Sequence, residues 1–147
     1  MGHFDETICD CCVCPMQCVL EQLVGLNVEI FTLNGRRTGT LIDVDNFIAV
    51  LDNREFPIHN ICAVSTYSPF DFKLKPIRKS VVGECSCTED PTTKLAESKI
   101  GSFEGIRAGE FINNGTISDV GEGIVILSSG GTTAISSCKI EEFGVFA

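Results

Sequence analysis

Positive charge is scarce in this sequence. Its 147 residues include 11 Lys and Arg against 20 Asp and Glu, which gives a formal net charge of −9 and a pI of about 4.6. Proteins that bind nucleic acids or anionic lipid surfaces neutralise phosphates mainly with Lys and Arg. We therefore expect neither nucleic acid nor a membrane surface among the partners of this chain.

Long apolar runs are lacking as well. No stretch of the sequence approaches the roughly 18 apolar residues that indicate a membrane span. The first residues, "MGHFDETICD", have neither the basic start nor the apolar run of a secretory signal peptide. We expect a protein made in the cytosol and not exported by that route, with enough apolar residues for one ordinary domain or two small ones.

Histidine, the usual general base, occurs only as His3 and His59. A thiol and base pair could be sought in His59 and Cys62, but two residues three apart near a strand tend to point to opposite faces. The sequence contains no other convergent set of His, Asp, Glu or Ser. We therefore expect the protein not to be an enzyme and to need no cofactor.

Cysteine, by contrast, is abundant. The stretch "CDCCVCPMQC", residues 9 to 18, holds five of the nine cysteines, and an odd total leaves at least one thiol without a partner inside the chain. Disulfides are uncommon in the reducing cytosol. Intermolecular pairing, metal binding and a free thiol all remain open at this point.

An internal repeat sorts these cysteines into two groups. Pro15 and Pro91 are 76 residues apart, and at the same offset "GTLIDVDNFIAVL" (39 to 51) matches "GTISDVGEGIVIL" (115 to 127). Two copies of one unit therefore fill the chain. The cysteine pairs that recur at this offset are Cys9 with Cys85, Cys11 with Cys87, and Cys62 with Cys138.

Each unit is predicted to contain an arm, a short helix and about five strands. A proline suited to the first turn and a glycine stop bound each helix, and β-branched runs separated by "NGRR", "DN", "INNG" and "SSGG" follow it. The fold class is therefore mainly β, with two tandem small barrels. We expect a cysteine-rich arm (1–14), a first barrel (15–66), a linker with the second Cys-x-Cys arm (67–90) and a second barrel (91–147).

The phrase "GTLIDVDNFIAVLDN" after a short helix resembles the first signature motif of Sm-like proteins, whose barrel is also SH3-like. The resemblance covers residues 15–66 and, more weakly, 91–146. It implies a small barrel with exposed edge strands. In that family the loop after the Asp binds RNA, and residues 43–47 would match it here, but they depart from the family pattern and no second Sm motif is present. RNA binding is therefore not carried over.

The same phrase, together with "PIHNICAVS" and the cysteine content, also resembles cysteine-rich proteins of the bacterial endospore coat and exosporium. Such proteins lack signal peptides, are made inside a mother cell and become cross-linked on the spore surface. The resemblance implies that location, with further copies of the chain and other spore-surface proteins as partners. It also removes the conflict between many cysteines and cytosolic synthesis.

Zinc binding and redox catalysis are two interpretations of the cysteines. Zinc could bind Cys9, Cys12, Cys14 and Cys18, because the chain offers interleaved Cys-x-x-Cys pairs, and the protein would then be an adaptor. A redox enzyme would need such a pair in a βαβ unit, which the sequence does not predict. A monomeric RNA-binding regulator is disfavoured by the charge.

The favoured hypothesis is a self-assembling structural protein whose arms form disulfides with neighbouring units. Cys85 and Cys87 would form disulfides with a neighbouring barrel of the same chain, while Cys9 and Cys11 would reach Cys62 or Cys138 of the next subunit. For these two late cysteines the alternative is a small buried apolar residue. The candidates for intermolecular disulfides are Cys9, Cys11, Cys12, Cys14, Cys62, Cys85, Cys87 and Cys138.

Overall fold

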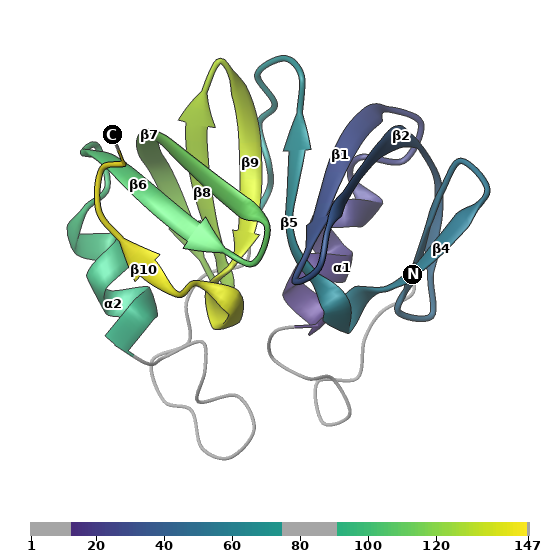
Figure 1. Ribbon diagram of the computed structural model, residues 1–147, viewed down its shortest axis with the longest axis horizontal. Coiled ribbons are helices and arrows are strands. Elements are labelled where there is room, and N and C mark those ends of the chain that lie inside the picture. The colour runs from purple at the N-terminus through teal and green to yellow at the C-terminus, as the bar shows by residue number, and fades with distance from the viewer. Residues whose placement is uncertain (1–12, 75–90, 147) are drawn as a thin grey trace.

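The computed structural model describes residues 13–74 and 91–146. The first repeat contains α1 (Val13–Glu21), β1 (Asn27–Thr32), β2 (Arg36–Asp45), β3 (Ile48–Leu51), β4 (Arg54–Pro57), the short helix η1 (Ile58–Asn60) and β5 (Ile61–Thr66). The second contains α2 (Pro91–Ser98), β6 (Phe103–Ala108), β7 (Phe111–Gly121), β8 (Ile124–Ser129), β9 (Gly131–Ser136), η3 (Ser137–Lys139) and β10 (Glu142–Phe143). The prediction of a mainly β protein is confirmed (Figure 1).

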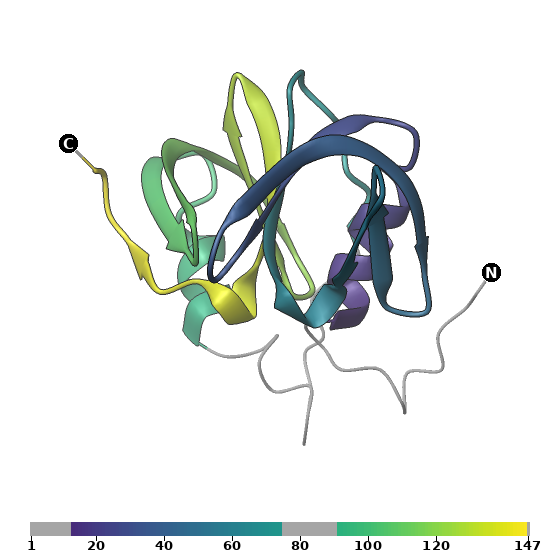
Figure 2. The ribbon, with the colours of Figure 1, turned by 45° about the vertical axis from the view of Figure 1, so that its right-hand side comes forward.

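The ten strands of the described residues belong to one antiparallel sheet, in the order β10-β6-β7-β8-β9-β5-β1-β2-β3-β4. The two repeats form two arcs of this sheet, and the strongly bent β2 arches over the first of them (Figures 1 and 2). The sheet is open, so the predicted pair of separate closed barrels is not confirmed. The reason is the place of β5: it pairs with β1 on one side and with β9 of the other repeat on the other, which leaves no edge of β5 for β4.

Equivalent glycines end the two helical segments. Gly25 and Gly101 have φ angles of 95° and 90°, a region that only glycine enters at little cost. The Gly25 amide donates to the Leu41 carbonyl at 2.7 Å, and the Gly101 amide donates to the Ile117 carbonyl at the same distance. The chain thus returns to the sheet in the same way in both repeats.

The longest matching phrase of the repeat contains a β-bulge. The register of β2 against β3 shifts between Leu41 and Asp43, and that of β7 against β8 shifts between Ile117 and Asp119. These positions are 76 residues apart, and a bulge bends a strand and increases its twist. The sequence repeat is therefore a structural repeat up to the third strand of each unit.

The difference in residue number between equivalent positions of the two repeats changes in the next hairpin. Ile48 pairs with Pro57, nine positions later, whereas its counterpart Ile124 pairs with Ser136, twelve positions later. The β8–β9 hairpin is thus three residues longer, and the offset becomes 79 after it. The sequence match of Cys62 with Cys138 is therefore wrong as a structural equivalence.

Two apolar clusters form the core, and each includes side chains from both repeats. The first contains the buried residues of α1 and of the first arc, and it also takes in Ile124, Ile126 and Ala134. The second contains the buried residues of the second arc, and it also takes in Phe31, Cys62 and Ala63. The two clusters thus meet where β5 lies beside β9.

Candidate functional site

Cys62 is a core residue. It lies in β5, has no exposed surface and carries a free thiol. Burial raises the pKa of this thiol above its ordinary value; the nearby charge of Lys139 opposes this effect, and that of Glu141 adds to it. Because the thiolate is the nucleophile in disulfide exchange, a buried thiol that keeps its proton reacts slowly.

Cys138 has a different environment. It lies in η3, is partly exposed and is disulfide-bonded. With the offset of 79, its counterpart in the first repeat is His59, and the counterpart of Cys62 is Glu141. Each chain therefore presents one late cysteine near its surface instead of one for each repeat.

The remaining predicted cysteines fall mostly outside the described residues. Cys9, Cys11, Cys12, Cys85 and Cys87 lie there, as does the side chain of Cys14. Of the predicted zinc ligands only Cys18 is described, as a half-buried residue of α1. Within residues 13–74 and 91–146, no three His, Cys, Asp or Glu side chains gather as they would around a metal ion.

The pair of His59 and Cys62 does not form a thiol and base site. His59 is exposed on η1, whereas Cys62 is buried in β5. The two side chains therefore lie in different surroundings. They are not placed to act together as nucleophile and base.

The junction between the repeats is formed by the pairing of β5 with β9. In this pairing, Val64 lies opposite Ala134 and Ser65 lies opposite Thr133. The hydroxyl groups of Ser65 and Thr133 share a hydrogen bond of 2.6 Å. Both strands are buried along most of their length, as expected for central strands of a sheet.

Small residues allow the repeats to approach closely at this junction. A Cβ atom added at Gly131 would overlap the Thr66 carbonyl oxygen. Beyond the paired strands, the Glu110 amide donates to the Thr32 carbonyl at 2.9 Å. The two arcs are therefore joined by backbone contacts as well as by side chains.

Helix α1 also takes part in the junction. Its Val19 is only 1% exposed and belongs to the same apolar cluster as Ile124 and Ala134 of the second repeat. Val19 and Ile124 line one small cavity together, which shows that they are neighbours. The helix of the first repeat thus covers the strands of the second.

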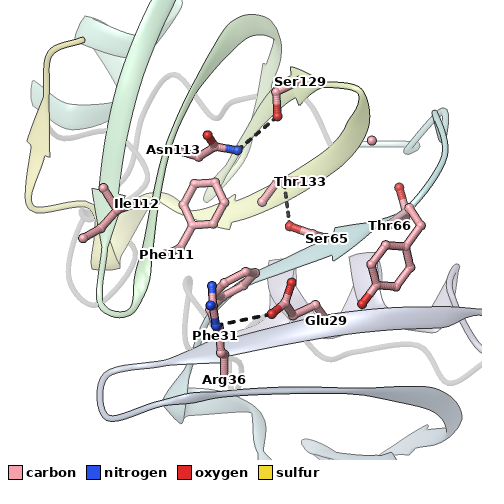
Figure 3. A pocket seen from close by; sticks show the side chains of 12 residues that line it. Glu29, Phe31, Arg36, Ser65, Thr66, Phe111, Ile112, Asn113, Ser129 and Thr133 are labelled. Atoms are coloured by element: carbon pink, nitrogen blue, oxygen red, sulfur yellow. Dashed lines mark hydrogen bonds and ion pairs between the residues drawn. The ribbon is translucent and has the colours of Figure 1, made fainter. Parts of the chain in front are cut away.

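A polar pocket of about 240 Å³ opens over the junction (Figure 3). Three interactions join side chains that line the pocket. They are the Ser65–Thr133 hydrogen bond, an Asn113 to Ser129 hydrogen bond of 3.2 Å and a Glu29–Arg36 ion pair of 3.5 Å. These polar groups thus have partners inside the protein. We interpret the pocket as the solvated seam of the junction, since its groups do not need a ligand to be satisfied.

The two outermost strands, β4 and β10, differ in character from β5 and β9. In the described part of the chain each has one neighbouring strand, so its other edge is open. Arg54, Glu55 and Glu142 are exposed there, and Pro57 is the last residue of β4. Charges and proline are typical of edge strands, because they discourage indiscriminate pairing.

Sequence reasoning missed the junction residues Val19, Ser65, Thr133 and Ala134. A signal was present, because "ICAVS" and "TAISS" are short and largely apolar or small on both faces, whereas "REFP" carries charges and a proline. A strand that is apolar on both faces is typical of the middle of a sheet. That contrast would have separated the inner strands from the outer ones.

Comparison with known proteins adds no further identification. No protein-family model, no curated protein and no solved structure matches this chain. Among the described residues, no helix has the length and apolar character needed to cross a membrane.

Proposed function

We propose that the protein is a non-enzymatic structural subunit whose copies assemble and become linked by disulfides. Cys138 carries this proposal, because it is partly exposed, lies in a short surface helix and is already part of a disulfide. Cys62 is too deeply buried to serve in the same way. We therefore take Cys138 as the late cysteine that receives an arm, and Cys9 or Cys11 as the attacking residue.

The linkage is a thiol–disulfide exchange. An arm thiol of one copy loses its proton, and the thiolate attacks the Sγ atom of Cys138 in the disulfide of another copy. A sulfur–sulfur bond forms between the copies while the previous bond breaks, and the former partner of Cys138 leaves as a thiolate that takes up a proton. The number of disulfides is unchanged, so no oxidant is consumed.

We place this assembly on the spore surface, as a coat or exosporium layer. The support is the resemblance of "GTLIDVDNFIAVLDN" and "PIHNICAVS" to proteins of that layer, together with the nine cysteines. A contact between a donor at one end and an acceptor elsewhere is heterologous, and such contacts close into rings or extend as filaments. Other spore-surface proteins are further proposed partners.

A denaturing gel of chelator-treated protein, run with and without reductant, tests the covalent part. We expect multimers that collapse to the 15.9 kDa chain in reductant. The ladder should disappear in the variant with Cys9, Cys11, Cys12 and Cys14 replaced by Ser, and in Cys138→Ser.

The matched control is Cys62→Ala, which should keep the ladder because Cys62 is buried. A ladder that survives all arm replacements would contradict the proposal. A single monomer band in every lane would do so too, and one zinc bound per chain would then favour the adaptor.

A further inference from the structure

The two strands at the open edges of the sheet, β4 and β10, are the counterparts of β9 and β5, the two strands that join its halves. Arg54 of β4 pairs with Leu51, and Thr133 of β9 pairs with the matching Leu127, so β4 corresponds to β9. In the same way, Val64 of β5 pairs with Ile30, and Phe143 of β10 pairs with Ile106. Therefore β10 corresponds to β5.

The helix beside each of these strands shows what the internal junction covers. Val19 of α1 is 1% exposed, and it lines one small cavity with Ile124 of the other repeat and with Leu74, which follows β5. Its counterpart in α2, 76 residues later, is Leu95, which is 45% exposed. An apolar side chain therefore stands in the junction position at the free end, where no other repeat covers it.

A groove lies next to this leucine. It has a volume of about 300 Å³ and is lined by Thr92, Leu95, Ile140, Glu141, Glu142 and Phe143. In the first repeat, the apolar cluster that contains residues of α1 and β5 is completed by residues of β8 and β9 together with Phe70, Phe72 and Leu74, which follow β5. The strands that would fill the groove in the same way are therefore β3 and β4, which stand at the opposite end of the sheet.

We propose that a second copy of this chain docks its β3–β4 hairpin into the groove between α2 and β10, head to tail. The internal junction serves as the template, and it places Glu55 of the second copy opposite Phe143. Ile48, the counterpart of Ile124, then contacts Leu95. Pro57 corresponds to Ser136, which lies one residue beyond the last β5–β9 pair, so its missing amide stands at the end of the contact and can remove only a terminal hydrogen bond.

The charges at this contact set its strength. The template places Arg54 of one copy diagonally across the strands from Glu142 of the other, a distance that long side chains span. The internal junction has Ala134 where this contact has Glu55, so the contact between copies buries less apolar surface. It is accordingly weaker than the internal junction, and it brings copies together reversibly before disulfides hold them.

This contact deepens the proposed function, since both require self-assembly, but it does not depend on the arms. The test therefore uses the background in which Cys9, Cys11, Cys12 and Cys14 are Ser. Sedimentation velocity of this protein should show concentration-dependent association. Leu95→Glu blocks the groove and Ile48→Glu blocks the hairpin, and each variant alone should be monomeric.

Mixing the two blocked variants gives the decisive result. One intact groove and one intact hairpin remain, so a head-to-tail contact predicts a 1:1 dimer of twice 15.9 kDa and nothing larger. Leu33→Glu introduces the same charge at a leucine that is 53% exposed in the β1–β2 turn, and it should associate like the background.

Three results would overturn the contact: a monomeric background protein at every concentration, unchanged association of the blocked variants, or a mixture without dimer although both variants keep the melting temperature of the background. If Ile48→Glu does not fold, Arg54→Glu at an exposed position takes its place. A covalent ladder on the gel together with a monomeric background would leave the proposed function standing and remove only this inference.

Discussion

The two repeats share a backbone but differ in what their helices meet. Three successive inward positions of α1 and the turn after it are Val19, Leu20 and Leu23, all buried. Their counterparts are Leu95, which is exposed, Ala96, which is buried but small, and Lys99, which is partly exposed. The glycines that end the helices and the β-bulges are thus common to both repeats. The size, polarity and burial of the helix side chains differ, according to whether the other repeat covers the helix.

The strongest test of this difference places a charge at the equivalent helix positions. Val19→Glu would bury a carboxylate without a partner, and we expect a loss of about 4 kcal/mol or more in the free energy of unfolding. Leu95→Glu should change it by less than about 0.5 kcal/mol, because the side chain reaches solvent. Urea unfolding measures both, and equal losses would show that Leu95 is covered within the monomer.

The next test exchanges the sizes of the buried side chains. Leu20→Ala should cost about 3 kcal/mol, since a fully buried leucine leaves a cavity. The reciprocal Ala96→Leu should cost about 1–3 kcal/mol through overpacking. Thermal unfolding of the two variants compares them, and a gain in stability from Ala96→Leu would mean that α2 has spare room.

A smaller effect is expected where one repeat has an ion pair and the other has apolar residues. Lys99 and Glu104 lie 3.4 Å apart, at the positions held by the buried Leu23 and Val28 in the first repeat. The double variant Lys99→Leu with Glu104→Val should stay within about 1 kcal/mol of the parent or exceed it. Each single variant should be less stable than the double, and a double-mutant cycle in urea would reveal the opposite order.

The smallest effect concerns the thiol of Cys62. Burial raises its pKa, so the folded chain keeps a proton that the unfolded chain releases once the pH passes the ordinary thiol pKa of about 8.5. Stability should therefore fall with rising pH slightly more steeply in the parent than in Cys62→Ala. Parallel slopes above that pH would show that the thiol titrates normally.

Much of the fold could be predicted from the sequence because it depends on local signals. Gly25, Gly101 and the matching "GTLIDV" and "GTISDV" phrases indicated two equal units of helix and strands. Strand β5 was identified from its β-branched content. Its partner was not, since pairing across repeats depends on contacts between distant parts of the chain.

The late cysteines illustrate a different limit. Cys62 and Cys138 agree at the offset of 76 only because the β8–β9 hairpin adds three residues before Cys138. An ungapped comparison cannot register such an insertion, and it paired a core residue with a surface one. The arm cysteines lie outside the described residues, so their predicted disulfides remain predictions.

The sharing of core residues between repeats has a consequence for unfolding. Ile124 and Ala134 complete the apolar cluster of the first repeat, and Phe31 completes that of the second. The ring centroids of Phe31 and Phe111 lie 5.1 Å apart. Melting either half would expose part of the other core to water. The duplicated chain should therefore melt in one calorimetric transition, as a single cooperative unit whose halves have lost the independence that two tandem domains would keep.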